Sequence, residues 1–231
     1  MPGNITLLTD FGTRDAYVGI MKGVILGICP DVTLVDLAHN IPPQDIMAGA
    51  FQLSTAVSYF PPGTIHVAVV DPGVGPNRRA IAVKTANNIL IAPDNGLLTL
   101  ALRRTPAQGC YCLDRSRFKL ADSSATFHGR DVFAPIAAQL AAGKTLRNVG
   151  APISHIDTLA MAVTEERDDG GLEGLVMHVD HFGNAITNIE ASQICALQGP
   201  VEVKVAGVTL TKLSETYSDV GRGETLALIG S

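Results

Sequence analysis

The sequence predicts an N-terminal α/β domain with a mainly parallel central sheet, followed by a smaller C-terminal antiparallel β domain of barrel-like form. In the first part of the chain, apolar runs rich in β-branched residues alternate with segments of helix length, which is typical of βαβ units. The segment 164–171, TEERDDGG, is charged and ends in glycine, which indicates a linker. Short alternating segments with turns between them follow it, as in sandwiches and barrels. We therefore expect domains over 1–163 and 172–231.

The first domain is expected to open with strands and helices in alternation. These are a strand over Asn4–Thr9, a helix over Asp15–Cys29, a strand over Thr33–Leu37, a helix from Pro43 to about Ser58, and a strand over Thr64–Val70. A hairpin should follow, because the pair Asn87-Asn88 tolerates the left-handed turn conformation. That hairpin spans Arg79–Pro93, and further helices are expected over Gly96–Arg104 and Asp131–Ala142. The second domain should contain strands over Leu172–Val179, Ala185–Ile189, Val201–Val205 and Thr209–Leu213.

Composition excludes several classes of protein. The 231 residues are 46% hydrophobic and 17% charged, which is enough apolar material for a substantial core. A net charge of −5 argues against a nucleic-acid or anionic-membrane partner. The N-terminus has no basic segment followed by a long apolar one, and no stretch reaches the ~18 apolar residues of a spanning helix. Four scattered cysteines without zinc spacing predict neither disulfide nor metal, so we expect a cytoplasmic protein.

The stretch Thr64–Arg79, TIHVAVVDPGVGPNRR, is the first candidate for chemistry. Its apolar strand ends on Asp71, and a glycine-rich turn then leads to the basic pair Arg78 and Arg79. Ligands of open α/β sheets bind just beyond the carboxyl ends of the strands, so a carboxylate and a guanidinium here suit a site. The alternative interpretation is a turn with a surface ion pair.

Two further strands also end near an aspartate, at Asp10 and Asp36. In a parallel sheet these carboxylates lie at the same edge as Asp71. Capping of the following helices is the alternative, and either Asp10 or Asp15 suits that role. We expect Asp10 to contact a ligand and Asp36 to be structural.

Two other clusters carry polar side chains. In Thr126–Pro135, TFHGRDVFAP, His128 precedes a predicted helix and could present a ring nitrogen to a ligand; the alternative is an ordinary loop residue. In the predicted hairpin VDHFGNAITNI, Asn184 offers a donor and an acceptor that match an adenine edge, and Phe182 offers a face for stacking. An ordinary turn at Gly183-Asn184 is the alternative there.

Some motifs are missing from the sequence. It has no Walker loop, no GxGxxG before a helix, no HExxH and no GxSxG. Phosphate-dependent and serine-hydrolase functions therefore have little support.

Five motifs in order resemble one family. They are TDFGTRDAYVGIMKGVI at Thr9–Ile25, VVDPGVGPNRR at Val69–Arg79, APDNGLL at Ala92–Leu98, FHGRDVFAP at Phe127–Pro135 and DHFGNAITNI at Asp180–Ile189. The family is that of the S-adenosyl-L-methionine (SAM) hydroxide adenosyltransferases, the adenosine-forming SAM hydrolases related to fluorinase and chlorinase. The resemblance implies a homotrimer with active sites at subunit interfaces, SAM as substrate and no cofactor.

The resemblance also implies roles for individual residues. An Asp-Arg-His set that handles the attacking water falls on Asp71, Arg78 and His128, with Arg79 as the alternative to Arg78. The ribose-binding aspartate falls on Asp10. Contacts to adenine and methionine fall on a final group, Asp180, Phe182, Asn184 and Ser231, the last residue of the sequence.

The expected reaction is therefore hydrolysis of SAM to adenosine and L-methionine by in-line attack on the ribose C5′. A positive charge on Arg78 should favour the hydroxide form of the nucleophile, with His128 and Asp71 orienting it and taking up its proton. The halogenating relatives carry other residues at these three positions. A chlorinase-like halogenase and a non-catalytic SAM- or adenosine-binding protein are the alternatives.

Overall fold

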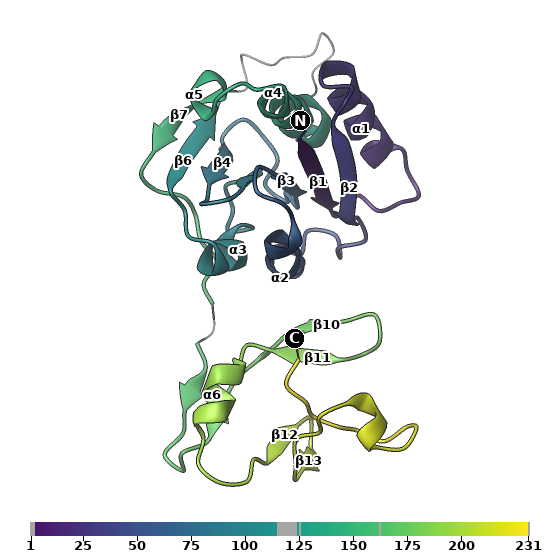
Figure 1. Ribbon diagram of the computed structural model, residues 1–231, viewed down its shortest axis with the longest axis vertical. Helices are drawn as coiled ribbons and strands as arrows, with labels where there is room; N and C mark the ends of the chain where they lie inside the picture. The colour runs from purple at the N-terminus through teal and green to yellow at the C-terminus, as the bar shows by residue number, and fades with distance from the viewer. Residues whose placement is uncertain (1–2, 115–123, 125, 162, 231) are drawn as a thin grey trace. The chain divides into compact units, whose positions relative to one another are not determined.

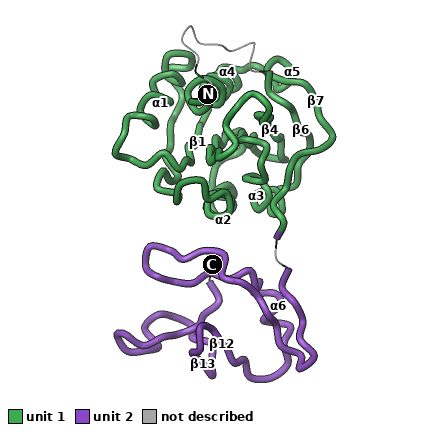
Figure 2. Tube along the Cα trace, turned by 180° about the vertical axis from the view of Figure 1, so that it is seen from behind, with its two compact units in different colours: residues 1–160 green, residues 161–231 purple. Residues whose placement is uncertain are grey.

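The chain divides into two compact units, residues 1–160 and 161–231 (Figure 2). The computed structural model describes residues 3–114, 124, 126–161 and 163–230. The positions of the domain boundaries stay a prediction.

A seven-stranded sheet in the order β2-β1-β3-β5-β4-β6-β7 organises the first unit (Figure 1). Its strands are β1 (Asn4–Thr9), β2 (Thr33–Ala38), β3 (Ile65–Val69), β4 (Ala80–Lys84), β5 (Ile89–Pro93), β6 (Gly109–Leu113) and β7 (Gly150–Ile153). The pairs β2-β1, β1-β3 and β3-β5 are parallel, as the alternating pattern predicted. The pairs β5-β4, β4-β6 and β6-β7 are antiparallel. The short β4–β5 connection explains part of this, because a tight hairpin joins only antiparallel strands.

Helices cover both faces of this sheet. They are α1 (Tyr17–Ile28), α2 (Ile46–Ala56), a 3₁₀ turn (Val57–Tyr59), α3 (Thr99–Arg104), a π-helical turn (Gly129–Phe133), α4 (Ala134–Ala141) and α5 (Leu146–Val149). In Figure 1, α1 and α4 lie on one face and α2 and α3 on the other. The first unit is thus a three-layer α/β/α sandwich.

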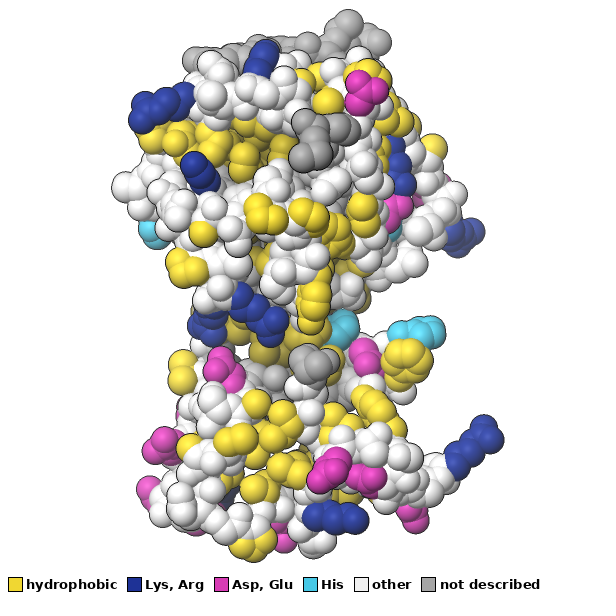
Figure 3. Space-filling view, viewed as in Figure 1, with side chains coloured by type: hydrophobic (Ala, Val, Ile, Leu, Met, Phe, Trp, Pro, Cys, Tyr) yellow, Lys and Arg dark blue, Asp and Glu magenta, His cyan; other side chains and the backbone are white. Residues whose placement is uncertain are grey.

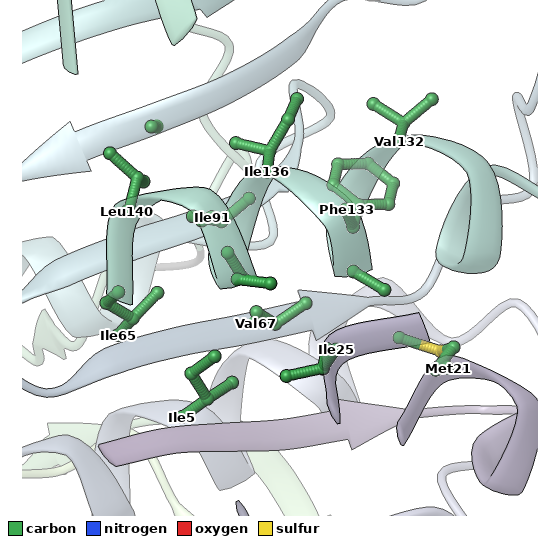
Figure 4. Packing of buried hydrophobic residues seen from close by; sticks show 14 of the residues in the cluster. Ile5, Met21, Ile25, Ile65, Val67, Ile91, Val132, Phe133, Ile136 and Leu140 are labelled. Carbon is green, nitrogen blue, oxygen red and sulfur yellow. The ribbon is translucent and has the colours of Figure 1, made fainter. Parts of the chain in front are cut away.

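Each face of the sheet has its own hydrophobic core. Alternate residues of a strand point to opposite faces, so Val67 and Val69 join the cluster under α1 and α4, while Ala68 and Val70 join the cluster under α2 and α3. Figure 4 shows Phe133 and Ile136 of the first cluster together with Val67 and Ile91 of the strands. The side chains of Phe133 and Ile136 are fully buried.

The second unit consists of short antiparallel pairs, which confirms a smaller antiparallel β region after the α/β region. The pairs are β8 (Glu165–Glu166) with β9 (Leu172–Glu173), β10 (Val176–Val179) with β11 (Ala185–Thr187), and β12 (Val203–Val205) with β13 (Val208–Leu210). A short helix, α6 (Ala191–Ala196), and a 3₁₀ turn (Tyr217–Asp219) complete it. The predicted linker 164–171 includes β8.

The capping alternative for the strand-end aspartates is wrong. Helix α1 begins after Ala16 without a side-chain cap, so neither Asp10 nor Asp15 caps it. Helix α2 is capped by Asp45, whose carboxylate accepts from the Ala48 N–H at 2.9 Å. This cap explains why α2 begins at Ile46 and not near Pro43 as predicted.

The part of the chain that the structure describes includes no helix long and apolar enough to cross a membrane. Lysine and arginine side chains lie scattered over the face shown in Figure 3.

Candidate active site

The parallel half of the sheet brings Asp10 and Asp71 to one edge. Strands β1 and β3 are neighbours, and Thr9 pairs with Val69 in their register. Asp10 follows the end of β1, and Asp71 lies two residues beyond the end of β3. The topology therefore places both carboxylates beyond the carboxyl ends of adjacent parallel strands, where α/β sheets bind ligands.

Asp71 and Arg78 form a paired contact within the loop between β3 and β4. The Nε–H of Arg78 donates to Oδ1 of Asp71 at 3.0 Å, and Nη2 of Arg78 makes an ion pair with Oδ2 of Asp71. The two side chains are only 8% and 6% exposed, so water screens their attraction weakly. The surface ion pair considered as the alternative is thus wrong, because this pair is buried.

His128 joins the same group from a distant part of the chain. Nη2 of Arg78 lies 2.9 Å from Nδ1 of His128, and His128 is 6% exposed. A guanidinium has no acceptor, so Nδ1 must be the acceptor in this hydrogen bond. In this arrangement the proton of the neutral imidazole is on Nε2.

Two further contacts fix the Arg78 guanidinium. Its Nη1 donates to the backbone carbonyl of Arg79 at 2.8 Å, and its Cζ lies 5.3 Å from the centroid of the Phe133 ring. A cation above a buried aromatic face gains about 2 kcal/mol when desolvated. Arg78 is therefore held on several sides. Phe133 was not predicted for the site, because an apolar residue in an apolar helix is typical of the hydrophobic core. The structure shows that it is both part of that core and a contact of Arg78.

Arg79 has a different partner. Its Nη2 lies 2.5 Å from Oδ2 of Asp94 and 3.9 Å from the carboxylate of Asp157, and its side chain is 40% exposed. The structure thus separates the two arginines, with Arg78 in the Asp71–His128 group and Arg79 outside it.

Asp10 is held by the segment before α2. Its Oδ2 accepts from the Gln44 N–H at 2.9 Å. Gln44 has a φ of 67°, which is a left-handed conformation that non-glycine residues rarely adopt. Strained backbone of this kind collects at functional sites, and Gln44 had no sequence signal that would have revealed it.

Gly129 allows the His128 segment to approach the end of β1. A Cβ atom at this position would lie 2.9 Å from Cε2 of Phe11 and 3.1 Å from Sδ of Met21. Phe11 also meets Phe127 and Tyr17 edge-on, with ring centroids 5.8 and 6.0 Å apart. The residues next to Asp10 and His128 therefore pack directly against one another.

The acidic residue of the same motif, Asp131, is structural. Its carboxylate accepts from Arg130 at 2.6 and 2.9 Å and from the Ser124 N–H at 2.6 Å. Burial alone would raise the pKa of Asp131, but these hydrogen bonds outweigh it and the pKa is lowered. Through these hydrogen bonds, Asp131 ties the start of the π-helical turn to residue 124.

Asp36 has structural partners, as expected. It contacts Nζ of Lys22 at 2.6 Å and Nε2 of His39 at 3.0 Å. Burial acts to raise the pKa of Asp36, but hydrogen bonds from Lys22 and His39 lower it overall.

The candidate residues of the second unit form a self-contained turn. Oδ1 of Asp180 accepts from the N–H groups of Phe182 and Asn184, both at 2.9 Å, and Oδ2 accepts from Nδ2 of Asn184 at 2.8 Å. These hydrogen bonds, led by that of the Asn184 side chain, lower the pKa of Asp180. The Phe182 ring is 87% exposed. Asp180 and Asn184 thus shape the turn, and the turn presents Phe182.

Two further predictions concern Ser231 and metal binding. Ser231 lies outside the described residues. In the described ranges there is no group of three or more His, Cys, Asp or Glu side chains placed to hold a metal ion.

Comparison with known proteins gives a consistent family. A model described as the SAM hydroxide adenosyltransferase N-terminal domain matches residues 5–150, and one described as the C-terminal domain of the same family matches residues 174–231. An (R)-S-adenosyl-L-methionine hydrolase of Thermus thermophilus is 40% identical over 98% of this chain and 88% of its own length. The hydrolase of the same name from Salinispora tropica is 37% identical over 98% and 86%.

More distant sequences and solved structures agree with this result. A fluorinase of an Actinoplanes species is 29% identical over 100% of this chain and 90% of its own length. The crystal structure of an uncharacterised conserved protein from Thermotoga maritima matches with a TM-score of 0.88 and 33% identity, covering 97% of this chain and 88% of that one. The family models span most of the chain and the five motifs lie within them. The chain therefore belongs to the SAM hydroxide adenosyltransferase family and is an enzyme of that family.

Proposed function

We propose that this protein hydrolyses (R)-S-adenosyl-L-methionine to adenosine and L-methionine, with Asp71, Arg78 and His128 acting on the nucleophile. The observation that carries the proposal is the buried hydrogen-bonded group of these three side chains, beyond the carboxyl ends of the parallel strands, in a chain of this family. The hydrolases at 37–41% identity are nearer than the fluorinase at 29%. Hydrolysis is therefore favoured over halogenation.

The chemistry needs an activated oxygen and little help for the leaving group. In the proposed step a bond forms between the water oxygen and ribose C5′ while the bond from C5′ to sulfur breaks. The electron pair of that bond goes to sulfur, which leaves as the neutral thioether of methionine. No acid is needed there, so the site acts on the nucleophile.

The three side chains divide this task by their hydrogen-bonding capacity. Arg78 has donors alone, and Nδ1 of His128 already accepts from it at 2.9 Å. A carboxylate carries about four lone-pair sites, so Asp71 has acceptor capacity beyond its contacts with Arg78. We therefore assign the proton from water to Asp71, and stabilisation of the hydroxide-like oxygen to Arg78 and Nε2–H of His128.

Substrate contacts are assigned to the other predicted residues. Asp10 binds the ribose, Phe182 stacks on the adenine, and Asp180 and Asn184 contribute through the turn that they form. Ser231 is assigned to the methionine end by the resemblance. A homotrimer with active sites at subunit interfaces, the absence of a cofactor and a cytoplasmic location also belong to this proposal.

The test is a product analysis with the purified full chain. The protein is incubated with the (R) and (S) forms of SAM in ¹⁸O-labelled water, with and without chloride, and products are followed by liquid chromatography and mass spectrometry. Adenosine with ¹⁸O at C5′ and an equal amount of methionine, formed faster from the (R) form, is expected.

Other products would contradict the proposal in distinct ways. Chloride-dependent 5′-chloro-5′-deoxyadenosine would show a halogenase. SAM binding in calorimetry without any product would show a binding protein. Sedimentation analysis of the same sample tests the trimer.

A further inference from the structure

The motif APDNGLL, at Ala92–Leu98, has no role in the proposed reaction. Its two polar residues, however, contact both ends of the loop between β3 and β4, which carries Asp71 and Arg78. Asp94 pairs with Arg79, the neighbour of Arg78. Asn95 donates through Nδ2 to the carbonyl of Val70, the neighbour of Asp71, at 2.9 Å. The turn that follows β5 thus fixes Val70, next to Asp71, and Arg79, next to Arg78.

Asp94 is built as the partner of a cation. Its side chain is 1% exposed, Oδ2 lies 2.5 Å from Nη2 of Arg79, and Oδ1 accepts from the Asp157 N–H at 2.7 Å. A buried carboxylate is costly unless it is paired and hydrogen-bonded, and both conditions hold here. Asp94 therefore commits Arg79 to one place.

The backbone links Asp94 to the guanidinium of Arg78 through a shared acceptor. The carbonyl oxygen of Arg79 accepts from the Asp94 N–H at 2.9 Å and from Nη1 of Arg78 at 2.8 Å. The group that orients Arg78 is thus itself fixed by the residue that binds Arg79.

Arg78 and Arg79 are adjacent in the chain, and the sequence alone does not decide which of them binds Asp71. Both carry a permanent charge and the same fork of donors, so either could bind Asp71. We propose that Asp94 and Asn95 are positioning residues that resolve this ambiguity. Asp94 removes Arg79 from competition for Asp71, so that Arg78 alone bridges Asp71 and His128, and Asn95 fixes the backbone from which Asp71 projects. This inference rests on the proposed function of that site.

The central test uses Asp94→Asn with and without Arg79→Met. Asp94→Asn keeps the shape of the side chain and releases Arg79, so kcat for adenosine formation is expected to fall about tenfold with little change in KM, as displaced catalytic groups do. In Asp94→Asn/Arg79→Met the competing cation is gone, and kcat should return to within about threefold of the wild-type value. A purely structural role gives a double variant no better than the single one.

Asp157→Asn is the matched control. It neutralises another carboxylate near Arg79, but one that is 59% exposed and 3.9 Å away, and its kcat should be unchanged. Circular dichroism establishes that each variant is folded. A wild-type kcat for Asp94→Asn, or no recovery in the double variant, overturns the proposal.

Two further measurements keep the inference testable. If Asp94→Asn does not fold, Asn95→Ala tests the other half, with an expected fall in kcat at constant KM; an unchanged kcat overturns that half. The Nε–H signal of Arg78 in ¹H–¹⁵N spectra reports its hydrogen bond to Asp71 without substrate. It should shift and exchange faster in Asp94→Asn and return in the double variant. If the wild-type protein makes no adenosine, the proposed function fails, and these spectra still decide the positioning role.

Discussion

The two groups of candidate residues differ in how they are built. In the first unit, Asp71, Arg78 and His128 are almost fully buried, and the hydrogen bond between Arg78 and His128 joins residues 50 positions apart in the chain. In the second unit, the bonds of Asp180 stay within a turn of a few residues, and Phe182 is 87% exposed. Donors that are buried and fixed before substrate arrives favour the chemical step, whereas an exposed ring on a firm turn favours binding.

The largest expected effect comes from removing the centre of the buried group. Arg78→Ala should lower kcat by about 10²–10³-fold, as loss of a fixed donor to a developing charge does, with a smaller change in KM. Arg78→Lys keeps the charge but loses the fork that holds Asp71 and His128 together, so it should rescue little activity. Steady-state kinetics with SAM measure both constants.

Arg104→Ala removes an exposed arginine at the end of α3 and serves as the control. Equal losses in kcat and in SAM affinity for Arg78→Ala would show that Arg78 binds substrate. The first unit would then not differ from the second in its role.

The second prediction concerns a buried histidine that sets the first unit apart in its response to acid. His66 in β3 is fully buried and bonded to Thr6 at 2.8 Å, and burial lowers its pKa to about 4 from the usual 6.5. Between these values the unfolded chain binds a proton that the folded chain does not. The free energy of unfolding should therefore fall as the pH drops from about 6.5 to 4, by at most roughly 3 kcal/mol.

Denaturant titrations at several pH values measure this fall, and hydrogen exchange locates it. Peptides from β1 and β3 should lose protection, and those from β10 and β11 should not. His66→Leu should flatten the profile, whereas His155→Gln, at a side chain 79% exposed, should not. An equally steep profile in His66→Leu would assign the acid sensitivity to other groups.

Two glycines allow the third comparison, because alanine meets a different obstacle at each. At Gly129 the new methyl would overlap the Phe11 ring at 2.9 Å, and at Gly183 the space is open but φ is +88°. We expect Gly129→Ala to lower the free energy of unfolding by about 2 kcal/mol through overpacking, and also kcat, because His128 is its neighbour. Gly183→Ala should lower it by about 1 kcal/mol through backbone strain alone. Thermal unfolding and kinetics on both variants test this; an equal fall in kcat would contradict it.

Much of the first unit was predictable because its signals are local and periodic. The bounds of β1 match the prediction, and the predicted β4–β5 hairpin is present, with its connection over residues 85–88. Neither Asn87 nor Asn88 has the positive φ that suggested this turn. The β7 strand and the short helices α5 and α6 had no prediction, since four to six residues carry too little periodicity. The antiparallel pairs β4-β6 and β6-β7 join strands that no tight turn connects, and strand patterns do not encode such pairing.

The family prediction from five motifs is confirmed, but the contacts within the site needed the structure. Sequence spacing favoured Arg78 over Arg79 without a physical reason, and the separate partners Asp71 and Asp94 now supply one. Phe133 was hidden because its position also suits the core. Gln44 was hidden because a left-handed φ at a glutamine leaves no mark in the sequence.

The smallest expected effect comes from the exposed ring of the second unit. Phe182→Ala should raise KM for SAM about tenfold, because stacking of one base on an aromatic ring is worth about 1–3 kcal/mol. It should leave kcat unchanged and alter the free energy of unfolding by less than about 0.5 kcal/mol, as substitutions of exposed side chains do. Phe182→Tyr keeps the ring face and should behave as wild type.

Tyr59→Ala is the matched control, since that ring is 84% exposed in the first unit and has no predicted role. If KM rises in Phe182→Ala and not in Tyr59→Ala, the exposed ring of Phe182 binds the substrate. The exposed turn then contributes to binding, and the buried group of the first unit to the chemical step. If KM stays constant while sedimentation shows that Phe182→Ala no longer assembles, the ring belongs to a contact between subunits. The adenine must then be bound by other residues, and the firmness of the Asp180–Asn184 turn serves assembly instead.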